Sequence, residues 1–342
     1  MEYVMDTIIF ALEAVFPIII LIFLGYYLKR QKFLDDIWFK NGNKLIFRLF
    51  VPCLLFINVY NIDSFTNINW SAVLFSEIAI VLVFFIGIVV VKMVIKDDKQ
   101  KGVVLQCIFR SNFAIIGLPL AEALGGIQGK GVAAVISAFS VPTFNILSVL
   151  ALSFFVKNED GRKVGIKNVF HKIVTNPLII GVVCGLIALL IRSLLPKSDD
   201  GQVIFSISKN VRFIYVAIEN IAKACSTIAL MVLGGQLDFK AVRGMKQQII
   251  IGALSRVVIV PGIVLGVAVL LSEYLEVLSF DASIYPALVA LFGSPVAVVS
   301  AVTAQEMGSD GVLAGQLVVW TSVLSIFTLF FFVLVLRLIG VL

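Results

Sequence analysis

Long apolar stretches alternate with short polar ones along the 342 residues of the chain. A helix needs about 20 apolar residues to cross the hydrocarbon core of a bilayer, and most of these stretches reach that length. The pattern predicts ten membrane-spanning helices, at about residues 7–28, 44–62, 71–95, 102–124, 131–156, 173–195, 213–237, 247–272, 284–304 and 312–340. A polar linker, 157–172, separates a first half, 1–156, from a second half, 173–342, and leaves no room for a soluble domain.

Two of the predicted spans contain a glycine followed two residues later by a proline. The fourth span has Gly117 and Pro119, the ninth has Gly293 and Pro295, and 176 positions separate the two pairs. Proline lacks the backbone donor and clashes with the preceding turn, and glycine lacks the side chain that stiffens a helix. Matched interruptions in two halves of a chain indicate the central binding site of a transporter. We therefore expect helices 4 and 9 to be broken at these prolines and to cross near the middle of the membrane.

The two halves also resemble each other elsewhere. Pro17 and Gly25 lie eight residues apart in the first span, and Pro177 and Gly185 have the same spacing in the sixth. Because each half has five spans, an odd number, the second half runs through the membrane in the opposite sense to the first. The expected fold is an all-α integral membrane protein of ten transmembrane helices, built as two inverted five-helix repeats with crossing broken helices 4 and 9.

Composition and charge agree with a membrane protein. Hydrophobic residues make up 60% of the chain and charged residues only 14%, far from the averages of soluble domains. The net charge of +6 could suggest a nucleic-acid partner, but the lysines and arginines gather in short loops, 17 on one side of the membrane and 6 on the other. This bias predicts that the linker 157–172 is cytoplasmic and that both termini lie outside the cytoplasm. Because the basic residues set the topology in this way, the expected partner is the lipid bilayer and not a nucleic acid.

The residues that build most enzyme and metal sites are scarce. The only histidine, His171, lies in a loop among lysines. The four cysteines lie in apolar spans without short spacing: Cys53, Cys107, Cys184 and Cys225. We therefore expect no metal site, no cofactor and no enzymatic activity.

The fourth span is the least apolar and carries the residues best suited to bind an anion. Arg110, Ser111 and Asn112 precede the expected break, and Ser294 lies within the break of the ninth span. Broken helices present free N–H groups and positive dipole ends, and an amide such as that of Asn112 donates to a carboxylate. The predicted substrate-binding residues are Arg110, Ser111, Asn112, Gly117, Pro119, Gly293, Ser294 and Pro295.

Each of these features also has a purely structural interpretation. Glycine–proline motifs occur in ordinary kinks, and Arg110, like Arg256 in the eighth span, can snorkel to the surface or pair with a glutamate. Polar residues in other spans are candidates for binding a coupling Na⁺ or H⁺, and hydrogen bonding between helices also explains the amides among them. These candidates are Asn58, Glu77, Glu122 and Gln236.

Three stretches are similar to the auxin efflux carrier family, which includes plant auxin exporters and bacterial malate or malonate permease-like proteins. The first runs from 17–26 on to 45–56, the second is 112–120, and the third is 176–181 together with 321–325 near the end. The order of the spans extends the resemblance over the whole chain. The resemblance implies a carrier of organic acids in the bacterial inner membrane, with an elevator-like motion and with Asn112 as a substrate contact. The plant exporters flank both crossover prolines with asparagine, which this chain lacks there, so the departure argues against auxin itself.

The leading functional hypothesis is a secondary transporter that moves a small organic anion, a mono- or dicarboxylate, by alternating access. The alternative is a cation–proton antiporter of similar fold. That chemistry usually needs a pair of carboxylates in the middle of the membrane, and no Asp-Asp pair lies within a span. Coupling to Na⁺ or H⁺, the direction of transport and the oligomeric state, a homodimer included, stay open.

Overall fold

The computed structural model describes residues 17, 19–61, 69–155, 174–195, 205–236 and 244–342. The regular elements of these residues are all helices, joined by turns and short unwound segments, with one isolated β-bridge and no strand. Part of the first predicted span and the whole predicted linker 157–172 lie outside the described residues. In chain order the elements are α2 (Asp36–Leu45), η1 (Ile46–Phe50), α3 (Val51–Tyr60), α4 (Trp70–Val94), α5 (Asp98–Phe109), η2 (Phe113–Gly117), α6 (Leu118–Phe155), α8 (Pro177–Leu194), α9 (Ile207–Asn210), α10 (Arg212–Gln236), α11 (Lys246–Leu254), η4 (Ser255–Ile259), α12 (Val260–Val269), η5 (Leu270–Tyr274), α13 (Ile284–Gly293), α14 (Val299–Glu306) and α15 (Gly311–Leu338).

Seven segments of the described chain are long and apolar enough to cross a membrane. They are α2 to α3, α4, η2 to α6, α8, α10, α11 to η5, and α15. The fourth predicted span is divided between α5 and the first part of α6, and the ninth between α13 and α14. The pieces of the ninth span are too short to cross a bilayer alone, which is one reason why the seven segments do not confirm the predicted ten.

The first part of α6 is separated from the rest by a local turn. Gly125 and Gly126 leave the helical conformation, and Gly126 has a φ of +60°, which only glycine adopts without strain. The sequence-based boundary between the fourth and fifth spans falls at this turn.

Three prolines inside the spans follow a widened, π-helical turn and do not break their helices. The turns η1, η2 and η4 end two residues before Pro52, Pro119 and Pro261. A wider turn moves away the carbonyl group with which the proline ring would clash. The predicted break at Pro119 is therefore wrong in position, because the fourth span unwinds earlier, at Arg110–Asn112.

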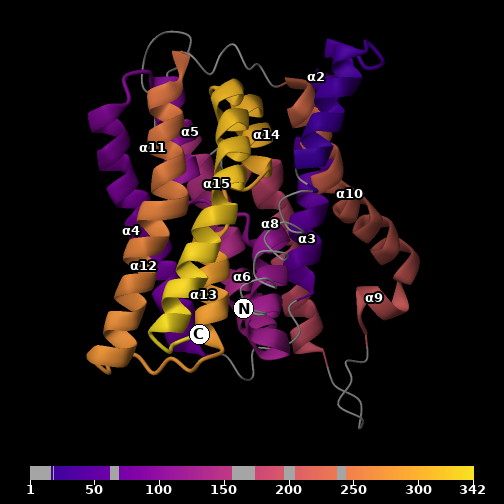
Figure 1. Ribbon diagram of the computed structural model, residues 1–342. Coiled ribbons are helices and arrows are strands. Elements are labelled where there is room, and N and C mark those ends of the chain that lie inside the picture. Colours follow the sequence, from indigo (N-terminus) through magenta and orange to yellow (C-terminus); the bar gives the residue numbers. More distant parts are fainter. Residues whose placement is uncertain (1–16, 18, 62–68, 156–173, 196–204, 237–243) are drawn as a thin grey trace.

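The two broken helices enter the middle of the molecule from opposite ends. Figure 1 shows α5 and α14 in the upper half and α13 in the lower half. Since α13 leads into α14, the C-terminal ends of α5 and α13 approach the same central region from above and below, and the unwound segments that follow them meet there. This arrangement places the free backbone groups of two helices at one point.

Close helix contacts at glycine occur at matching places in the two halves. A Cβ atom added at Gly25 would lie 1.9 Å from the carbonyl oxygen of Met231, on α10. A Cβ atom added at Gly185, on α8, would lie 3.0 Å from the carbonyl oxygen of Phe56, on α3. Positions 56 and 231 are 175 residues apart, close to the 176 that separate the two glycine–proline pairs. The inverted repeat stays a prediction, and these paired contacts are what it would produce.

Candidate functional site

The unwound segments of the two broken helices satisfy part of each other's backbone. The amide of Asn112 donates to the carbonyl oxygen of Pro295 over 2.9 Å, and Ser111 and Val296 form an antiparallel bridge. The amide of Val296 also donates to the Thr321 hydroxyl, on α15, over 3.2 Å. Unpaired backbone groups are costly inside a membrane, so these contacts stabilise the crossing of the two segments. We call this region, residues 110–112 and 294–298, the crossover.

Arg110 is held at the crossover by two neutral side chains of α6. Its guanidinium donates to the Asn145 amide oxygen over 2.9 Å and to the Ser148 hydroxyl over 3.1 Å, and the residue is 4% exposed. None of the ion pairs among the described residues includes Arg110. A buried cation without an anionic neighbour is expensive, and this cost makes Arg110 a ready partner for an anion.

Two hydrogen-bond donors beside Arg110 have no partner. The side-chain nitrogen of Asn112 and the hydroxyl of Ser111 are buried and make no hydrogen bond. A buried donor without an acceptor costs about 1–3 kcal/mol, so proteins seldom leave several of them together without a functional reason. Both donors line the same cavity as the Arg110 guanidinium.

These groups line a small cavity of about 50 Å³. Asn58, on α3, and Asn145 complete its polar lining, and none of the described residues that line it is acidic. The apolar lining consists of Val51, Leu54, Leu55, Ala114, Ile115, Val141, Phe144, Ala297 and Val299. A buried water needs about 10–15 Å³ by this measure, so the cavity has room for a few water-sized groups. A larger ligand would need the surrounding helices to move apart.

Arg256 lies behind the crossover, and its hydrogen bonds within the described part of the chain go to backbone carbonyl groups. It is fully buried and donates to Ser294 over 3.0 Å, to Phe292 over 2.8 Å and to Leu291 over 3.1 Å. Two longer bonds, of 3.3 and 3.5 Å, reach the last residues of α5, Phe109 and Ile108. The sequence left snorkelling and ion pairing open for Arg256. The residue is fully buried and belongs to none of the ion pairs among the described residues, so neither occurs there.

The other predicted substrate residues do not line the cavity, although Ser294 and Pro295 belong to the crossover. Gly117 and Pro119 belong to η2 and α6, below the unwound segment. The Ser294 hydroxyl donates to the carbonyl oxygen of Ala290 over 2.6 Å, and Gly293 packs against Leu329. The second half therefore contributes mainly backbone to the crossover, through Pro295 above all.

The predicted coupling residues are spread over different parts of the molecule. Asn58 lines the crossover cavity, whereas Glu122 forms an ion pair with Lys130 over 2.8 Å. Glu77 accepts a hydrogen bond of 2.6 Å from Thr143 and is not a partner of Arg110.

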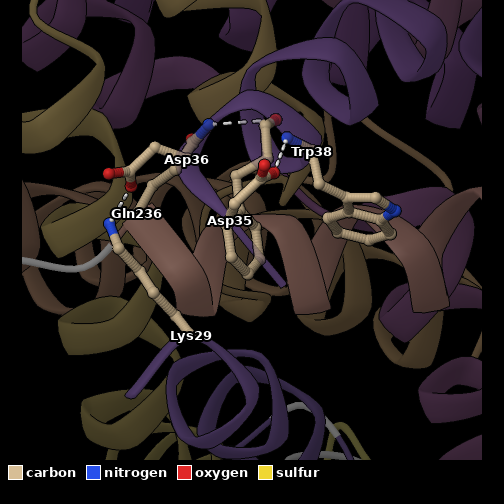
Figure 2. Close-up of polar contacts among 6 residues, drawn as sticks. Lys29, Asp35, Asp36, Trp38 and Gln236 are labelled. Atoms are coloured by element: carbon tan, nitrogen blue, oxygen red, sulfur yellow. Dashed lines mark hydrogen bonds and ion pairs between the residues drawn. The ribbon is translucent and has the colours of Figure 1, made fainter. Parts of the chain in front are cut away.

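Gln236 lies in a second cavity, of about 310 Å³, between α10 and the start of α15. Its amide donates to the carbonyl oxygen of Phe39 over 3.4 Å, close to the ion pair of 2.8 Å between Lys29 and Asp36 (Figure 2). Gln305 also lines this cavity, and no crossover residue does. The structure thus separates Gln236 from the group formed by Arg110 and Asn112.

Sequence reasoning missed the side chains that support the site. Asn145 and Ser148 hold the Arg110 guanidinium, and Thr321 holds the backbone of the ninth span. The available signal was a polar residue in an otherwise apolar span, since such residues tend to hydrogen-bond between helices or to serve function. Nothing in the sequence alone says which span each one faces.

Comparison with known proteins gives the family. No curated protein matches the chain. A family model described as membrane transport protein matches residues 10–333, which is almost the whole chain. The chain therefore belongs to this family of membrane transport proteins, the auxin efflux carrier family.

Proposed function

We propose that this carrier moves a small organic anion by alternating access, with one carboxylate of the substrate bound at the crossover. The observation that carries the proposal is the composition of the crossover cavity. The Arg110 guanidinium, which has no anionic partner, lines it together with the unpaired donors of Ser111 and Asn112, and none of the described lining residues is acidic. The Arg110 guanidinium supplies donors only, and the unpaired side-chain nitrogen of Asn112 and hydroxyl of Ser111 can donate to an incoming ligand as well. This combination suits a carboxylate.

The single cation limits what the cavity recognises. Among the described residues that line the cavity, Arg110 is the only charged one, so it neutralises one carboxylate. The rest of a substrate would meet apolar side chains such as those of Leu55 and Phe144. A monocarboxylate, or a dicarboxylate with its second group turned toward water, fits this lining better than a compact dianion does.

The position of the cavity supports an elevator-type motion. One wall is α3, which packs tightly on α8 through Gly181 and Gly185. The opposite wall is the crossover with α6. A substrate between two such bodies can be carried when one body slides along the other. In this proposal the small cavity corresponds to a position in which the two bodies lie close together. As part of the proposal, the carrier lies in a bacterial inner membrane with both termini outside the cytoplasm.

A proton-coupled mode is the second candidate, because of Glu77. This residue lies within α4, accepts one hydrogen bond from Thr143, and leaves its other carboxylate oxygen buried without a partner. An ionisable residue inside a span is a functional candidate by default. Two buried arginines at the crossover argue against a cation as the cargo there, so we assign Glu77 at most to coupling.

The test is ligand-induced stabilisation of the purified protein. Malonate, malate, lactate and benzoate, added as choline salts, should raise the melting temperature if they bind only the folded state. The Asn112→Ala variant should lose the response to any hit, because it removes the unpaired donor and leaves the fold intact. The matched control is Asn220→Ala, which removes an exposed amide from α10, away from the cavity.

The outcomes separate the two candidate functions. An anion response that is lost in Asn112→Ala and kept in Asn220→Ala supports anion transport. An equal response in all three proteins would refute the crossover as the site. A response to pH alone that disappears in Glu77→Gln would favour the cation–proton antiporter.

A further inference from the structure

We propose that Arg256 is a resident cation, which occupies the place at the crossover where an inverted-repeat carrier could otherwise bind a coupling metal ion. The guanidinium lies where the carbonyl groups of two broken helices converge, and it is fully buried. On this view the anion binds at the crossover without Na⁺. Its consequence for substrate binding rests on the proposed anion site. The experiment that tests it measures Na⁺ binding and does not depend on that site.

The acceptors of Arg256 are the carbonyl groups that a helix leaves unsatisfied at its C-terminal end. The last four carbonyl groups of a helix lack an intrahelical partner, and the dipole concentrates partial negative charge there. Ile108 and Phe109 end α5, and Leu291, Phe292 and Ser294 belong to the end of α13 and its cap. Arg256 is the donor for all five.

The same set of groups is a typical cation site in carriers of this architecture. Unwound backbone carbonyls and half-helix C-terminal ends coordinate Na⁺ or take part in proton binding in inverted-repeat transporters. Here Arg256, on η4, already supplies a positive charge and donates to five carbonyl groups. A metal ion at this place would meet electrostatic repulsion and oxygen ligands that are already occupied.

Arg256 also prepares the crossover for an anion. Two C-terminal helix ends alone would give the centre of the molecule a negative potential and would repel a carboxylate. Because Arg256 neutralises these ends from behind, Arg110 on the cavity side is left to attract the substrate. Arg256 is thus a positioning residue, which sets the charge preference of the site without lining the cavity.

The test compares Na⁺ with choline at equal chloride concentration and ionic strength. The melting temperature of the purified wild-type protein should be the same in NaCl and in choline chloride. Arg256→Ala leaves five carbonyl groups around an empty space, and it should gain a Na⁺-specific rise of at least about 2 °C. Arg256→Lys keeps the charge with fewer donors, so it should melt lower than wild type and still ignore Na⁺.

A Na⁺-specific stabilisation of the wild type would overturn the proposal, because it requires a metal site despite Arg256. A folded Arg256→Ala that ignores Na⁺ would overturn it as well. If Arg256→Ala does not fold in either salt, Arg256→Gln replaces it, since this neutral variant retains one donor group. A Na⁺-specific rise in its melting temperature then supports the proposal, and the absence of one overturns it. The anion response of the wild type in choline salts tests the proposed function separately, so the two ideas can fail independently.

Discussion

Replacing Arg110 by methionine should cost little stability and most of the substrate affinity. The change removes a buried charge whose insertion costs about 2.5–3.5 kcal/mol in the middle of a membrane. It also leaves the amide oxygen of Asn145 without its donor, at a cost of about 1–3 kcal/mol, while Ser148 keeps its bond of 2.6 Å to the carbonyl oxygen of Phe144. The two effects have opposite signs and similar sizes. We therefore expect the free energy of unfolding to change by about 1 kcal/mol or less.

The effect on binding has no such compensation. A hydrogen bond to a charged group contributes about 1.5–3 kcal/mol, which corresponds to about 10- to 100-fold in the dissociation constant. The apparent affinity for an anion hit should therefore fall by at least that factor in Arg110→Met. Titration calorimetry in detergent measures the dissociation constant, and thermal unfolding without ligand measures stability. Lys223→Met serves as the control, because it removes a cation from α10 that does not line the crossover cavity.

A particular pair of results would refute this reasoning. If Arg110→Met lost more than about 3 kcal/mol of stability but bound the anion with wild-type affinity, the guanidinium would be a helix-packing residue. The anion site would then have to lie elsewhere.

Three further predictions test the architecture. Ser111→Cys and Val296→Cys, combined in a cysteine-free background, should form a disulfide under mild oxidation, because residues opposed in an antiparallel bridge lie within bonding distance. After cleavage at a protease site inserted at 157–172, the two halves should then migrate together on a non-reducing gel. Gly25→Val should abolish folded protein, because its Cβ would meet a carbonyl oxygen at 1.9 Å, whereas Gly266→Val, with open space around it, should express normally. Pro119→Ala should bind the anion as wild type does, since the span unwinds before this proline, and a loss as large as that of Asn112→Ala would show that the proline itself maintains the break.

Several features of the fold could be predicted from the sequence because they depend on local properties. Apolar length gave the spans α4, α8, α10 and α15 within a few residues, since a bilayer fixes how many apolar residues a helix needs. The ninth span breaks at Gly293 and Pro295 as expected, because proline cannot donate and no π-turn precedes it there.

The first break shows what local chemistry leaves undecided. Glycine and proline at 117 and 119 looked equivalent to those at 293 and 295, yet a widened turn accommodates Pro119. The chain unwinds instead at Arg110–Asn112, where the partner segment accepts and donates backbone hydrogen bonds. Whether an interruption becomes a kink or a break depends on the partner that satisfies the freed groups, and that partner lies far away in the sequence.

The same division holds for the candidate site. Arg110, Ser111 and Asn112 were recognisable because polar residues are rare and costly in an apolar span. The different roles of the two buried arginines were not: Arg110 faces a cavity with unpaired donors, and Arg256 faces five carbonyl groups. Both are arginines at similar depth in their spans, so only the tertiary structure decides which one lines a cavity, because it alone brings the ends of α5 and α13 together around the other.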